Sequence, residues 1–389
     1  MRIPLSYNIR NLAVRRTTTV MTALGIGLTV AVLAAAMSLT AGLREAFRSS
    51  GHPLQLILVR KGSGAELGSQ LSRESFNEVI KYRPGIARLA DGEPAASPEL
   101  VNTINLPSTE SPDGMNLTLR GVLPVGIAMR EESKLVQGRW FEFGKREVVV
   151  GSDIANRYPD AGLGRKVRLG RGDWLVVGVY ESTYPARNSE LLGDANQMLA
   201  EFDRGSFFSS ALLRAQDEVA LQALINGLGA EQRLQLDVLT ENEYYARQSS
   251  SGDLIQYVGT FVAIIMAIGS VFAAMNTMYA AVARRSKEIG TLRVLGFSRR
   301  SILASFFIES MILAVLGGVA GLLLVLPLNG LTTGIGSDAT FAEVAFQLRL
   351  TPNVALTGMI FALIVGAVGG LLPAFGAARK QILTALRDN

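Results

Sequence analysis

The sequence ARRSKEIGTLRVLGFSRR occupies residues 283–300 and lies between two long apolar runs. The run before it, Leu254–Val282, contains no Lys, Arg, Asp or Glu and exceeds the roughly 20 residues that a helix needs to cross a bilayer. The run after it begins at Ser301 and contains one acid, Glu309. A short connection with six cations and one acid is typical of the cytoplasmic side of a membrane, so this stretch sets the predicted topology.

The composition is that of a membrane protein. Of 389 residues, 49% are hydrophobic, and the mean hydropathy is +0.28, with the excess concentrated in a few long runs. The net charge of +5 does not indicate a nucleic-acid partner, because the cations cluster beside the apolar runs. The absence of cysteine and the single His52 argue against disulfides, thiolate metal sites and histidine-based catalysis.

Charge and hydropathy together divide the chain into segments. These are an amphipathic cytoplasmic-face helix at 1–17, a first span at 18–43, an extracytoplasmic domain at 44–253, a second span with a stalk at 254–282, a cytoplasmic segment at 283–300, a third span at 301–326, an outer loop at 327–352, a fourth span at 353–377 and a cytoplasmic tail at 378–389. For residues 1–17, a plain basic tail is the alternative. The first apolar run is too long for a secretory signal peptide, whose core has about 7–15 residues.

The predicted fold is therefore an α-helical membrane protein with four transmembrane helices and an α+β extracytoplasmic domain between the first two. Cations beside every inner end place both termini in the cytoplasm. Within the domain, alternating patterns predict strands at 54–59, 116–122, 147–150, 166–169, 174–180 and 210–214, helices at 72–82 and 218–228, and a loop at 107–114.

Two glycine pairs at a spacing of four occur in the later spans. Gly317 and Gly321 lie in the third span, and Gly366 and Gly370 lie in the fourth. Small residues at this spacing let two helices approach closely in lipid. We expect the third and fourth spans to pack against each other here, and an oligomer contact is the alternative.

No stretch of the sequence fits a nucleotide-binding loop. The nearest candidate, Gly138–Lys145, has the wrong glycine spacing and is followed by Arg146 instead of Ser or Thr. We expect no cofactor, catalytic group or metal in this chain. The polar residues within the spans are essentially Asn276 and Glu309, too few for a polar substrate path. A large outer domain and a basic inner loop suggest a lever, not a channel.

Several motifs carry a resemblance to a known family. Residues 287–300 resemble the cytoplasmic segment of FtsX-like permeases, and residues 307–321, with an acid before a Gly-Gly pair, resemble their third span. Residues 15–27 and 370–387 resemble their two ends, although the tail lacks the usual proline. Residues 138–141, 149–155 and 176–179 resemble the MacB-type periplasmic core. The chain is identified as a member of the FtsX-like, MacB-type (type VII) ABC transporter permeases, similar to the MacB, LolC/LolE, DevC and HrtB permeases.

This resemblance implies a permease subunit that works by mechanotransmission in a bacterial cytoplasmic (inner) membrane. A separate ABC ATPase, holding ATP and Mg²⁺, would drive periplasmic movements that export or extract a substrate. A second permease copy, a periplasmic adaptor, an outer-membrane component and membrane lipid are the other implied partners. The alternative is an FtsX-like regulator that acts on an extracytoplasmic cell-wall hydrolase without transport.

The resemblance also implies which residues couple the permease to the ATPase. They are Lys287, Glu288, Ile289, Gly290, Arg293 and Gly296. Anchoring of the basic loop to anionic lipid is the alternative, and it applies best to Arg284, Arg285, Arg299 and Arg300. Glu309 is either functional or structural, and in the second case it would be neutralised by a partner such as Arg293 or by water.

Overall fold

The computed structural model describes residues 10, 12–14, 16–108, 112–248, 250–336 and 342–379. The chain divides into two compact units, which we call the membrane unit (Met1–Ala41, Asp253–Leu331 and Leu348–Asn389) and the head (Gly42–Gly252 and Thr332–Gln347). Much of the predicted amphipathic helix at 1–17 lies outside the described residues, as does the predicted tail at 378–389 beyond Arg379.

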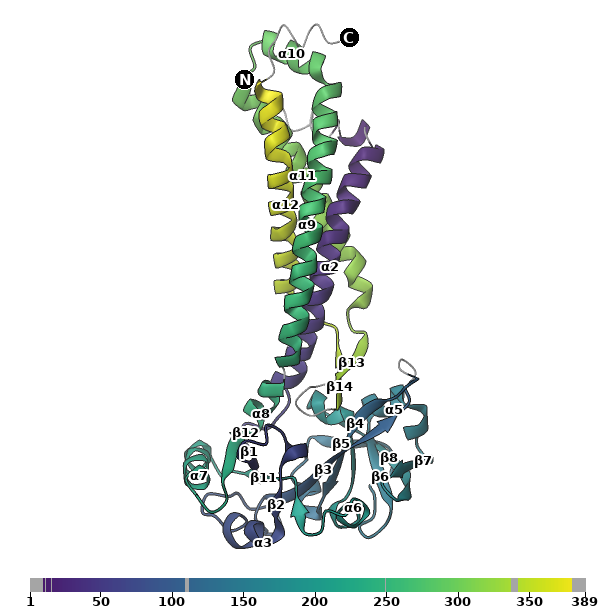
Figure 1. Cartoon of the computed structure of the whole chain (residues 1–389), viewed down its shortest axis with the longest axis vertical. Coiled ribbons are helices and arrows are strands. Elements are labelled where there is room, and N and C mark those ends of the chain that lie inside the picture. Colours follow the sequence, from purple (N-terminus) through teal and green to yellow (C-terminus); the bar gives the residue numbers. More distant parts are fainter. Residues whose placement is uncertain are drawn as a thin grey trace. The chain divides into compact units, whose positions relative to one another are not determined.

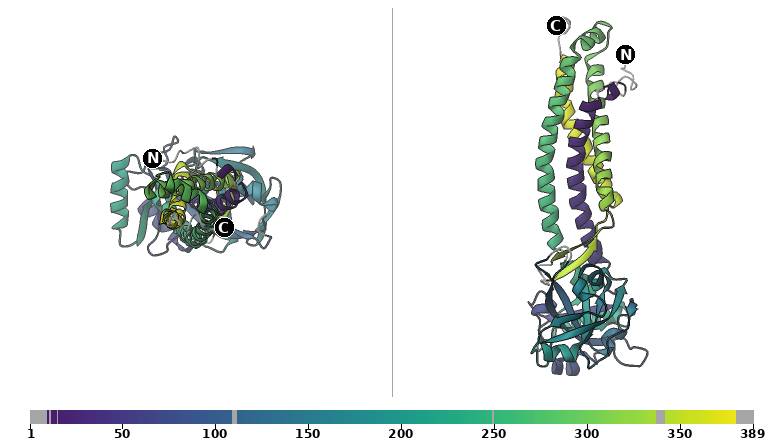
Figure 2. Two further views of the ribbon diagram at one scale, coloured as in Figure 1. Left: turned by 90° about the horizontal axis from the view of Figure 1, so that it is seen from above. Right: turned by 90° about the vertical axis from the view of Figure 1, so that its right-hand side faces the viewer.

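Four long helices form the membrane unit. They are α2 (Arg16–Arg48), α9 (Ser250–Arg284), α11 (Arg299–Val325) and α12 (Pro352–Arg379), with the short α10 (Ser286–Val294) and η5 (Leu326–Leu328) between them. Each long helix contains a stretch long and apolar enough to cross a membrane, and Figures 1 and 2 show the four side by side. The predicted four spans are confirmed. The 35 residues of α9 make a helix of about 52 Å, which exceeds the roughly 30 Å of hydrocarbon in a bilayer.

The two glycine pairs pack in different directions. A Cβ added to Gly317 or Gly321 would lie 2.8 or 2.4 Å from a backbone carbonyl oxygen of α2. The third-span pair therefore packs against the first span, which was not predicted, although the predicted packing of the third span against the fourth is confirmed. Gly366 and Gly370 do face α11, where an added Cβ would meet side chains of that helix. A pair of glycines creates a groove on a helix, but the spacing alone does not specify which neighbour fills it.

The head is built on a sheet with strand order β12-β1-β11-β3-β4-β9-β6-β8-β5, and β7 pairs with β8. The strands are β1 (Gln55–Arg60), β3 (Ala96–Leu106), β4 (Met115–Val122), β5 (Ser133–Gly138), β6 (Glu147–Gly151), β7 (Lys166–Leu169), β8 (Gly172–Ser182), β9 (Glu190–Asp194), β11 (Ser210–Arg214) and β12 (Leu236–Thr240). The short strands β2 (Leu71–Ser72) and β10 (Phe207–Phe208) pair separately.

Short helices and turns surround the sheet. They are η1 (Glu66–Gly68), α3 (Arg73–Ser75), η2 (Phe76–Ile80), α4 (Pro124–Ala128), α5 (Ser152–Arg157), η3 (Pro159–Ala161), η4 (Pro185–Ser189), α6 (Ala195–Glu201), α7 (Glu218–Gly229) and α8 (Glu241–Gln248). The predicted α+β domain is therefore confirmed.

The long strand β3 is shared by two lobes of the head. Its residues 96–99 pair with β11, and its residues 100–106 pair with β4. The first lobe contains β1, β11, β12 and α7, whose apolar side chains pack around Leu56 and Leu213. The second lobe contains β4 to β9, whose core includes the fully buried Trp174 and Tyr158. Each lobe thus buries its own apolar cluster, while one strand runs through both.

The six predicted strands and the helix at 218–228 are confirmed to within two residues at either end. The predicted helix at 72–82 forms as one α-helical turn, α3, followed by the π-helical turn η2. Strand β3 was not predicted, because Pro98 lies within it. Pro98 lies in the half of β3 that pairs with β11 alone. No second neighbouring strand there requires the N–H group that proline lacks.

The predicted outer loop at 327–352 contains a β-hairpin, formed by β13 (Thr332–Gly336) and β14 (Glu343–Gln347). The hairpin belongs to the head, and residues 343–346 of β14 are all buried. Glu343 forms an ion pair with Arg157 at 2.5 Å and accepts a hydrogen bond from the hydroxyl of Tyr158. The strand is hidden in the sequence because it begins with a charged residue whose partner is distant along the chain.

Candidate functional site

Residues 283–300, the predicted coupling segment, form the helix α10 and a turn on each side of it. Arg285 lies between α9 and α10 with a non-helical ψ of 17°. Gly296, which is exposed, follows α10 with a φ of +92°, a left-handed conformation that glycine adopts without strain. Ser298 then starts α11 by accepting a hydrogen bond from the N–H of Ser301 at 3.2 Å.

One face of α10 packs against this chain. Ile289 belongs to an apolar cluster with Ile302 and Phe306 of α11, and Gly290 is buried beside it. These two predicted coupling residues therefore attach α10 to the membrane unit. They do not form its outer surface.

The other face of α10 is open. Lys287 and Glu288 are exposed, and Val294 and Leu295 are each 63% exposed despite being apolar. Arg293 is half-buried and donates a hydrogen bond to a carbonyl of the turn after α10 at 3.3 Å. The described residues of this chain leave Val294 and Leu295 uncovered, and adjacent exposed aliphatic side chains of this kind can mark a contact surface.

A buried ion pair joins the start of α10 to α11. Nη1 of Arg285 lies 3.2 Å from Oε2 of Glu309, and Nε of Arg285 lies 3.0 Å from Oε2 of Glu288. The guanidinium also lies 5.1 Å from the ring centre of Phe306. The structure thus neutralises Glu309 with Arg285, where the sequence had suggested Arg293. It also removes Arg285 from the predicted lipid-facing cations, because the turn between α9 and α10 directs this side chain inward.

The polar contacts between α2 and α9 come from hydroxyl groups. Thr22 donates a hydrogen bond to Thr277 at 3.3 Å, and the hydroxyls of Thr29 and Ser270 lie 2.6 Å apart. Asn276, the other predicted intramembrane polar residue, is exposed on α9. The hydroxyl pairs were missed because Ser and Thr do not interrupt an apolar run as charged residues do.

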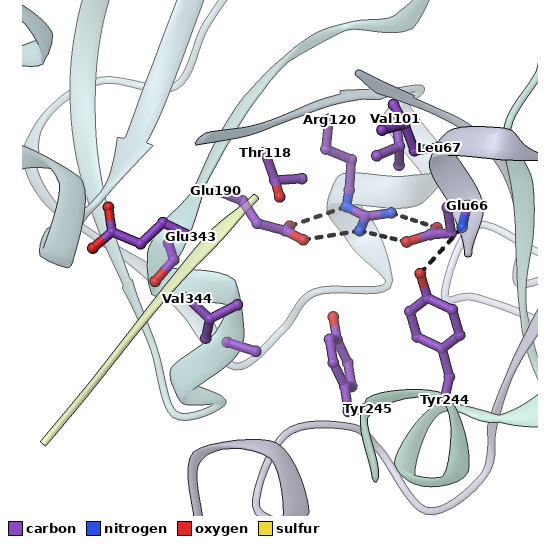
Figure 3. Close-up of a pocket in the computed structure, with 12 residues that line it drawn as sticks. Glu66, Leu67, Val101, Thr118, Arg120, Glu190, Tyr244, Tyr245, Glu343 and Val344 are labelled. Carbon is purple, nitrogen blue, oxygen red and sulfur yellow. Dashed lines mark hydrogen bonds and ion pairs between the residues drawn. The ribbon is translucent and has the colours of Figure 1, made fainter. Parts of the chain in front are cut away.

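The head contains an ion network that the sequence did not indicate. Figure 3 shows the guanidinium of Arg120, on β4, between the carboxylates of Glu190 and Glu66. Each carboxylate pairs with Arg120 through two hydrogen bonds of 2.8–3.0 Å. Glu99 on β3 accepts hydrogen bonds from Arg120 at 2.9 Å and from Arg130 at 2.7 Å. All five side chains belong to residues that are at most 5% exposed.

The pKa values of Glu66, Glu99 and Arg120 are each shifted in the direction that favours the charged form. Burial alone would raise the pKa of Glu66, but Arg120 and a hydrogen bond from Ser210 outweigh it and hold this pKa below its ordinary value. The pKa of Glu99 is likewise lowered, because Arg130 and Arg120 outweigh burial. Burial opposes the charge of Arg120, yet the nearby carboxylates raise its pKa well above the usual range. The arrangement therefore fixes strands of both lobes in place through buried pairs of opposite charge.

A small cavity of about 30 Å³ lies beside Arg120. Tyr244 and Tyr245 of α8 and Val344 of β14 contribute to its lining, and the hydroxyl of Tyr244 accepts a hydrogen bond from the N–H of Glu66 at 3.3 Å. Burial raises the pKa of both tyrosines, so their hydroxyls stay neutral. Among the described residues, no group of three or more His, Cys, Asp or Glu side chains is placed to hold a metal ion.

Two family models match most of the chain. Residues 19–230 match the MacB-like periplasmic core domain, and residues 260–382 match the FtsX-like permease C-terminal model. The first of these covers more than half of the sequence. The chain belongs to the MacB-type, FtsX-like family of ABC transporter permeases. In this permease, the FtsX-like match contains α10, the Arg285–Glu309 pair and both glycine pairs, and the MacB-like match contains the Arg120 network.

Individual relatives agree with this assignment. The permease is 24% identical over 383 residues to the uncharacterized ABC transporter permease YknZ of Bacillus subtilis strain 168, with 94% of this chain and 92% of YknZ covered. It is 25% identical to the macrolide export ATP-binding/permease protein MacB of Pasteurella multocida strain Pm70, over 75% of this chain and 46% of that protein. The alignment thus spans about half the length of that MacB relative.

A solved structure of the periplasmic region of MacB from Actinobacillus actinomycetemcomitans is also similar. It is 17% identical, has a TM-score of 0.37, and covers 50% of this chain and 92% of that one.

Proposed function

We propose that this permease works by mechanotransmission. ATP binding and hydrolysis by a separate ATPase, which would hold the ATP and Mg²⁺, displace α10 and the spans attached to it. The displacement reshapes the head, and the head exports or extracts a substrate without passing it between the spans. In this proposal the permease lies in a bacterial inner membrane, and a periplasmic adaptor and an outer-membrane component are further partners.

The observation that supports this proposal most strongly is the way α10 is attached. Its start is tied to α11 by the buried Arg285–Glu309 pair and by Ile289, while Lys287 and Leu295 on its other side are open. A short helix that is firmly attached on one face and exposed on the other can receive a push and pass it on. A loop that was only anchored to lipid would need neither the ion pair nor the apolar cluster.

The proposal predicts that Arg293→Glu lowers ATP turnover of the permease–ATPase complex. Reversing one charge at a protein contact weakens the interaction by at least about 1.4 kcal/mol, so turnover measured at a limiting concentration of ATPase should fall by about tenfold or more. Arg299→Glu, in the exposed start of α11, is the matched control and should change turnover by less than about twofold. Unchanged turnover and unchanged ATPase co-purification with Arg293→Glu would rule out this coupling assignment.

The same proposal requires α10 in the cytoplasm and the head outside. The chain contains no cysteine, so a single introduced cysteine is the only thiol in this chain that a reagent can label. Val219→Cys, at a position that is 81% exposed on α7, should react with an impermeant maleimide in intact cells. Lys287→Cys should react only after the membrane is opened. The reverse pattern would contradict the proposed topology.

A second copy of the permease is part of this proposal, and α9 supports it. Phe261, Ile265, Phe272 and Asn276 are exposed on α9 at spacings of four, seven and four, which places them on one helix face. Phe272→Cys should therefore form a disulfide-linked dimer in membranes treated with an oxidant such as copper–phenanthroline, which accepts the two electrons from the two thiols. Ile360→Cys, at a position that is 49% exposed on α12, is the control and should not.

The alternative function is regulation of an extracytoplasmic cell-wall hydrolase without transport. The extent of the match to the MacB-like periplasmic core, over residues 19–230, favours the export function. Two results together would favour the regulator instead. The full-length permease would capture a cell-wall hydrolase, and cells that lack the permease would retain no more of the candidate substrates than the parent strain does.

A further inference from the structure

The turn η4, between β8 and β9, occupies an unusual place in the head. Its residues Ala186, Arg187 and Ser189 are buried, and Pro185 stands at its first position, where a missing N–H costs nothing. Three segments of the chain that lead into the spans each contact η4. All of these contacts lie within the head.

The first segment is the one that leaves α2. The N–H of Ala186 donates a hydrogen bond to Oγ of Ser50 at 2.9 Å, and Ser50 is fully buried. The hydroxyl of Ser50 donates in turn to the carbonyl of Ala46, in the last turns of α2, at 2.5 Å. A single hydroxyl therefore connects the end of α2 to η4.

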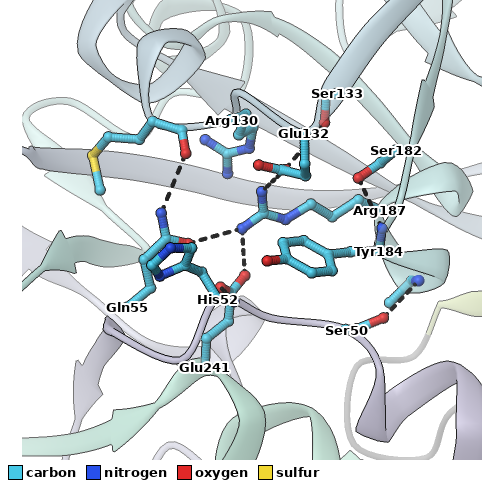
Figure 4. Close-up of polar contacts among 12 residues, drawn as sticks. Ser50, His52, Gln55, Arg130, Glu132, Ser133, Ser182, Tyr184, Arg187 and Glu241 are labelled. Atoms are coloured by element: carbon cyan, nitrogen blue, oxygen red, sulfur yellow. Dashed lines mark hydrogen bonds and ion pairs between the residues drawn. The ribbon is translucent and has the colours of Figure 1, made fainter. Parts of the chain in front are cut away.

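The second segment is α8, which is followed along the chain by α9. Nη2 of Arg187 lies 2.5 Å from Oε1 of Glu241, the first residue of α8, as Figure 4 shows. Arg187 and Glu241 are 2% and 1% exposed. The second oxygen of Glu241 accepts a hydrogen bond from the N–H of His52 at 2.8 Å. The same carboxylate thus holds α8 and the chain after α2 to η4.

The third segment is the β13–β14 hairpin, which connects α11 to α12. The N–H of Ala345, on β14, donates a hydrogen bond to Oγ of Ser189 at 2.9 Å. The ion pair between Glu343 and Arg157 lies on the same strand and fixes the hairpin to α5. With this contact, the segments that continue into all four spans each reach a residue of η4, at Ala186, Arg187 or Ser189.

On its other side, η4 is joined firmly to the second lobe. The hydroxyl of Tyr180, on β8, donates a hydrogen bond to the carbonyl of Arg187 at 2.5 Å. Asn188 accepts a hydrogen bond from the N–H of Ser182 at 2.7 Å. A Cβ at Gly151, on β6, would lie only 2.1 Å from the carbonyl oxygen of Asn188, so β6 and η4 are in direct backbone contact. Displacement of η4 must therefore displace β6 and β8.

We propose that η4 is the junction through which movement of the four spans enters the second lobe, and that Arg187 is the positioning residue that holds α8 to it. This inference rests on the proposed mechanotransmission and names the element that receives the movement. A buried arginine suits this role because its planar fork makes several directional contacts at once. Besides Glu241, the Arg187 guanidinium contacts Glu132 and, at 3.2 Å, Gln55.

The test uses the full-length permease with its ATPase in lipid nanodiscs and hydrogen–deuterium exchange read by mass spectrometry. Exchange is compared between the nucleotide-free and the vanadate-trapped complex, in peptides from α10 and in peptides covering η4 and β9. In the parent protein, both sets should respond to the nucleotide. In Glu241→Gln, the response of the η4–β9 peptides should be about fivefold smaller while the α10 response remains.

Two further variants keep the test decisive. Ser189→Ala removes a single hydrogen-bond acceptor and leaves the charges intact, so it should fold and reduce the η4–β9 response by a smaller factor. Arg168→Gln breaks an exposed ion pair in the same lobe and should leave the response unchanged. If α10 does not respond in the parent protein, the proposed function fails. If α10 responds but the η4–β9 response is the same in the parent, Glu241→Gln and Ser189→Ala, the junction at η4 is wrong.

Discussion

The membrane unit and the head differ in what joins elements that are distant along the chain. In the membrane unit, close contacts between helices occur where side chains are absent, as at Gly321, where the carbonyl of Gly27 occupies the space that a Cβ would need. The head also has close backbone contacts at glycine, as at Gly151, but several buried ion pairs, around Arg120 and Arg187, join its distant elements as well. One buried ion pair, Arg285–Glu309, is described within the membrane unit.

The difference follows from the two surroundings. Lipid provides no hydrophobic force between apolar helices, so close backbone approach and dispersion must hold them together. Water drives apolar side chains into the two cores of the head, and buried charges there are tolerated only when they are fully paired. Close helix contacts with a few polar pairs therefore hold the membrane unit, whereas the head combines two apolar cores with several buried ion pairs. Four measurements test this difference.

Arg120→Gln should have the largest effect. Removing this cation leaves Glu66 and Glu190 buried without their main partner, and the free energy of unfolding of the head should fall by about 3–5 kcal/mol. Denaturant unfolding of the full-length protein, followed by the fluorescence of its two tryptophans, Trp140 and Trp174, which both lie in the head, measures it. Arg168→Gln, in an exposed pair, should cost less than about 1 kcal/mol. Equal losses of stability in the two variants would show that the buried ion pairs contribute no more to the head than exposed pairs do.

Glu309→Gln should have the next largest effect. Arg285 would lose its buried partner but keep Glu288, so the free energy of unfolding should fall by about 2–3 kcal/mol. Thermal unfolding of the permease in detergent, followed by circular dichroism, measures the loss. Glu288→Gln, at an exposed side chain, is the control. A loss greater than that of Arg120→Gln would show that buried ion pairs contribute more to stability in the membrane unit than in the head.

Gly321→Ala should cost about 1–2 kcal/mol, because a methyl group would meet backbone on α2 that cannot move aside easily. Gly269→Ala, on α9, is the matched control, since a Cβ there would meet nothing within 4 Å. The same thermal unfolding experiment compares the two variants. Indistinguishable stabilities would show that close approach at this glycine does not hold the spans together.

The smallest effect concerns pH. Burial, with help from Arg214, lowers the pKa of His52 below 6.5, although Glu241 and Glu132 oppose the shift. Neutral His52 also accepts a hydrogen bond from the N–H of Leu54 at 3.1 Å. A base with a lowered folded-state pKa stabilises the protein fully above pH 6.5, and this contribution is lost as the pH falls through the folded-state value.

His52→Gln should therefore remove part of the decline in stability between about pH 7 and 5. His52 is the only histidine in the chain, so its imidazole resonance can be followed directly by NMR in the labelled permease. A midpoint above 6.5 would contradict the stated direction of the shift.

The membrane unit could be predicted from the sequence because its determinants are local. Charge beside apolar runs predicted the four spans, and the basic stretch at 283–300 predicted the cytoplasmic connection between the second and third spans, where α10 lies. The partner of Gly321 and the partner of Glu309 could not be predicted, because each depends on which helices become neighbours. Local patterns thus gave the elements of this unit, and the contacts between them required the structure.

The head was harder to predict for a related reason. Glu99, Glu190 and Glu343 each lie in a buried strand, and a charged residue in such a position conceals the alternation that identifies a strand. Their arginine partners are far away along the chain: Arg120 is 70 residues from Glu190. A neutralising partner at that distance leaves no trace in the local pattern. Strand β7, which has no buried charge, was predicted correctly, and so was β4, whose apolar and polar residues alternate beside the buried Arg120.

Strand β3 has a consequence for exchanging parts between relatives. Its upstream half pairs with β11 and its downstream half with β4. The side chains that β3 contributes to the two lobes therefore follow one continuous alternation between the two faces of the sheet. One residue inserted between Glu99 and Leu100 would turn every downstream side chain of β3 to the opposite face, taking Leu100 and Ile104 out of the second core. A chimaera that joins lobes from two homologues within β3 must therefore keep each side chain of this strand on its original face of the sheet. A junction placed in a surface loop does not have to meet this condition.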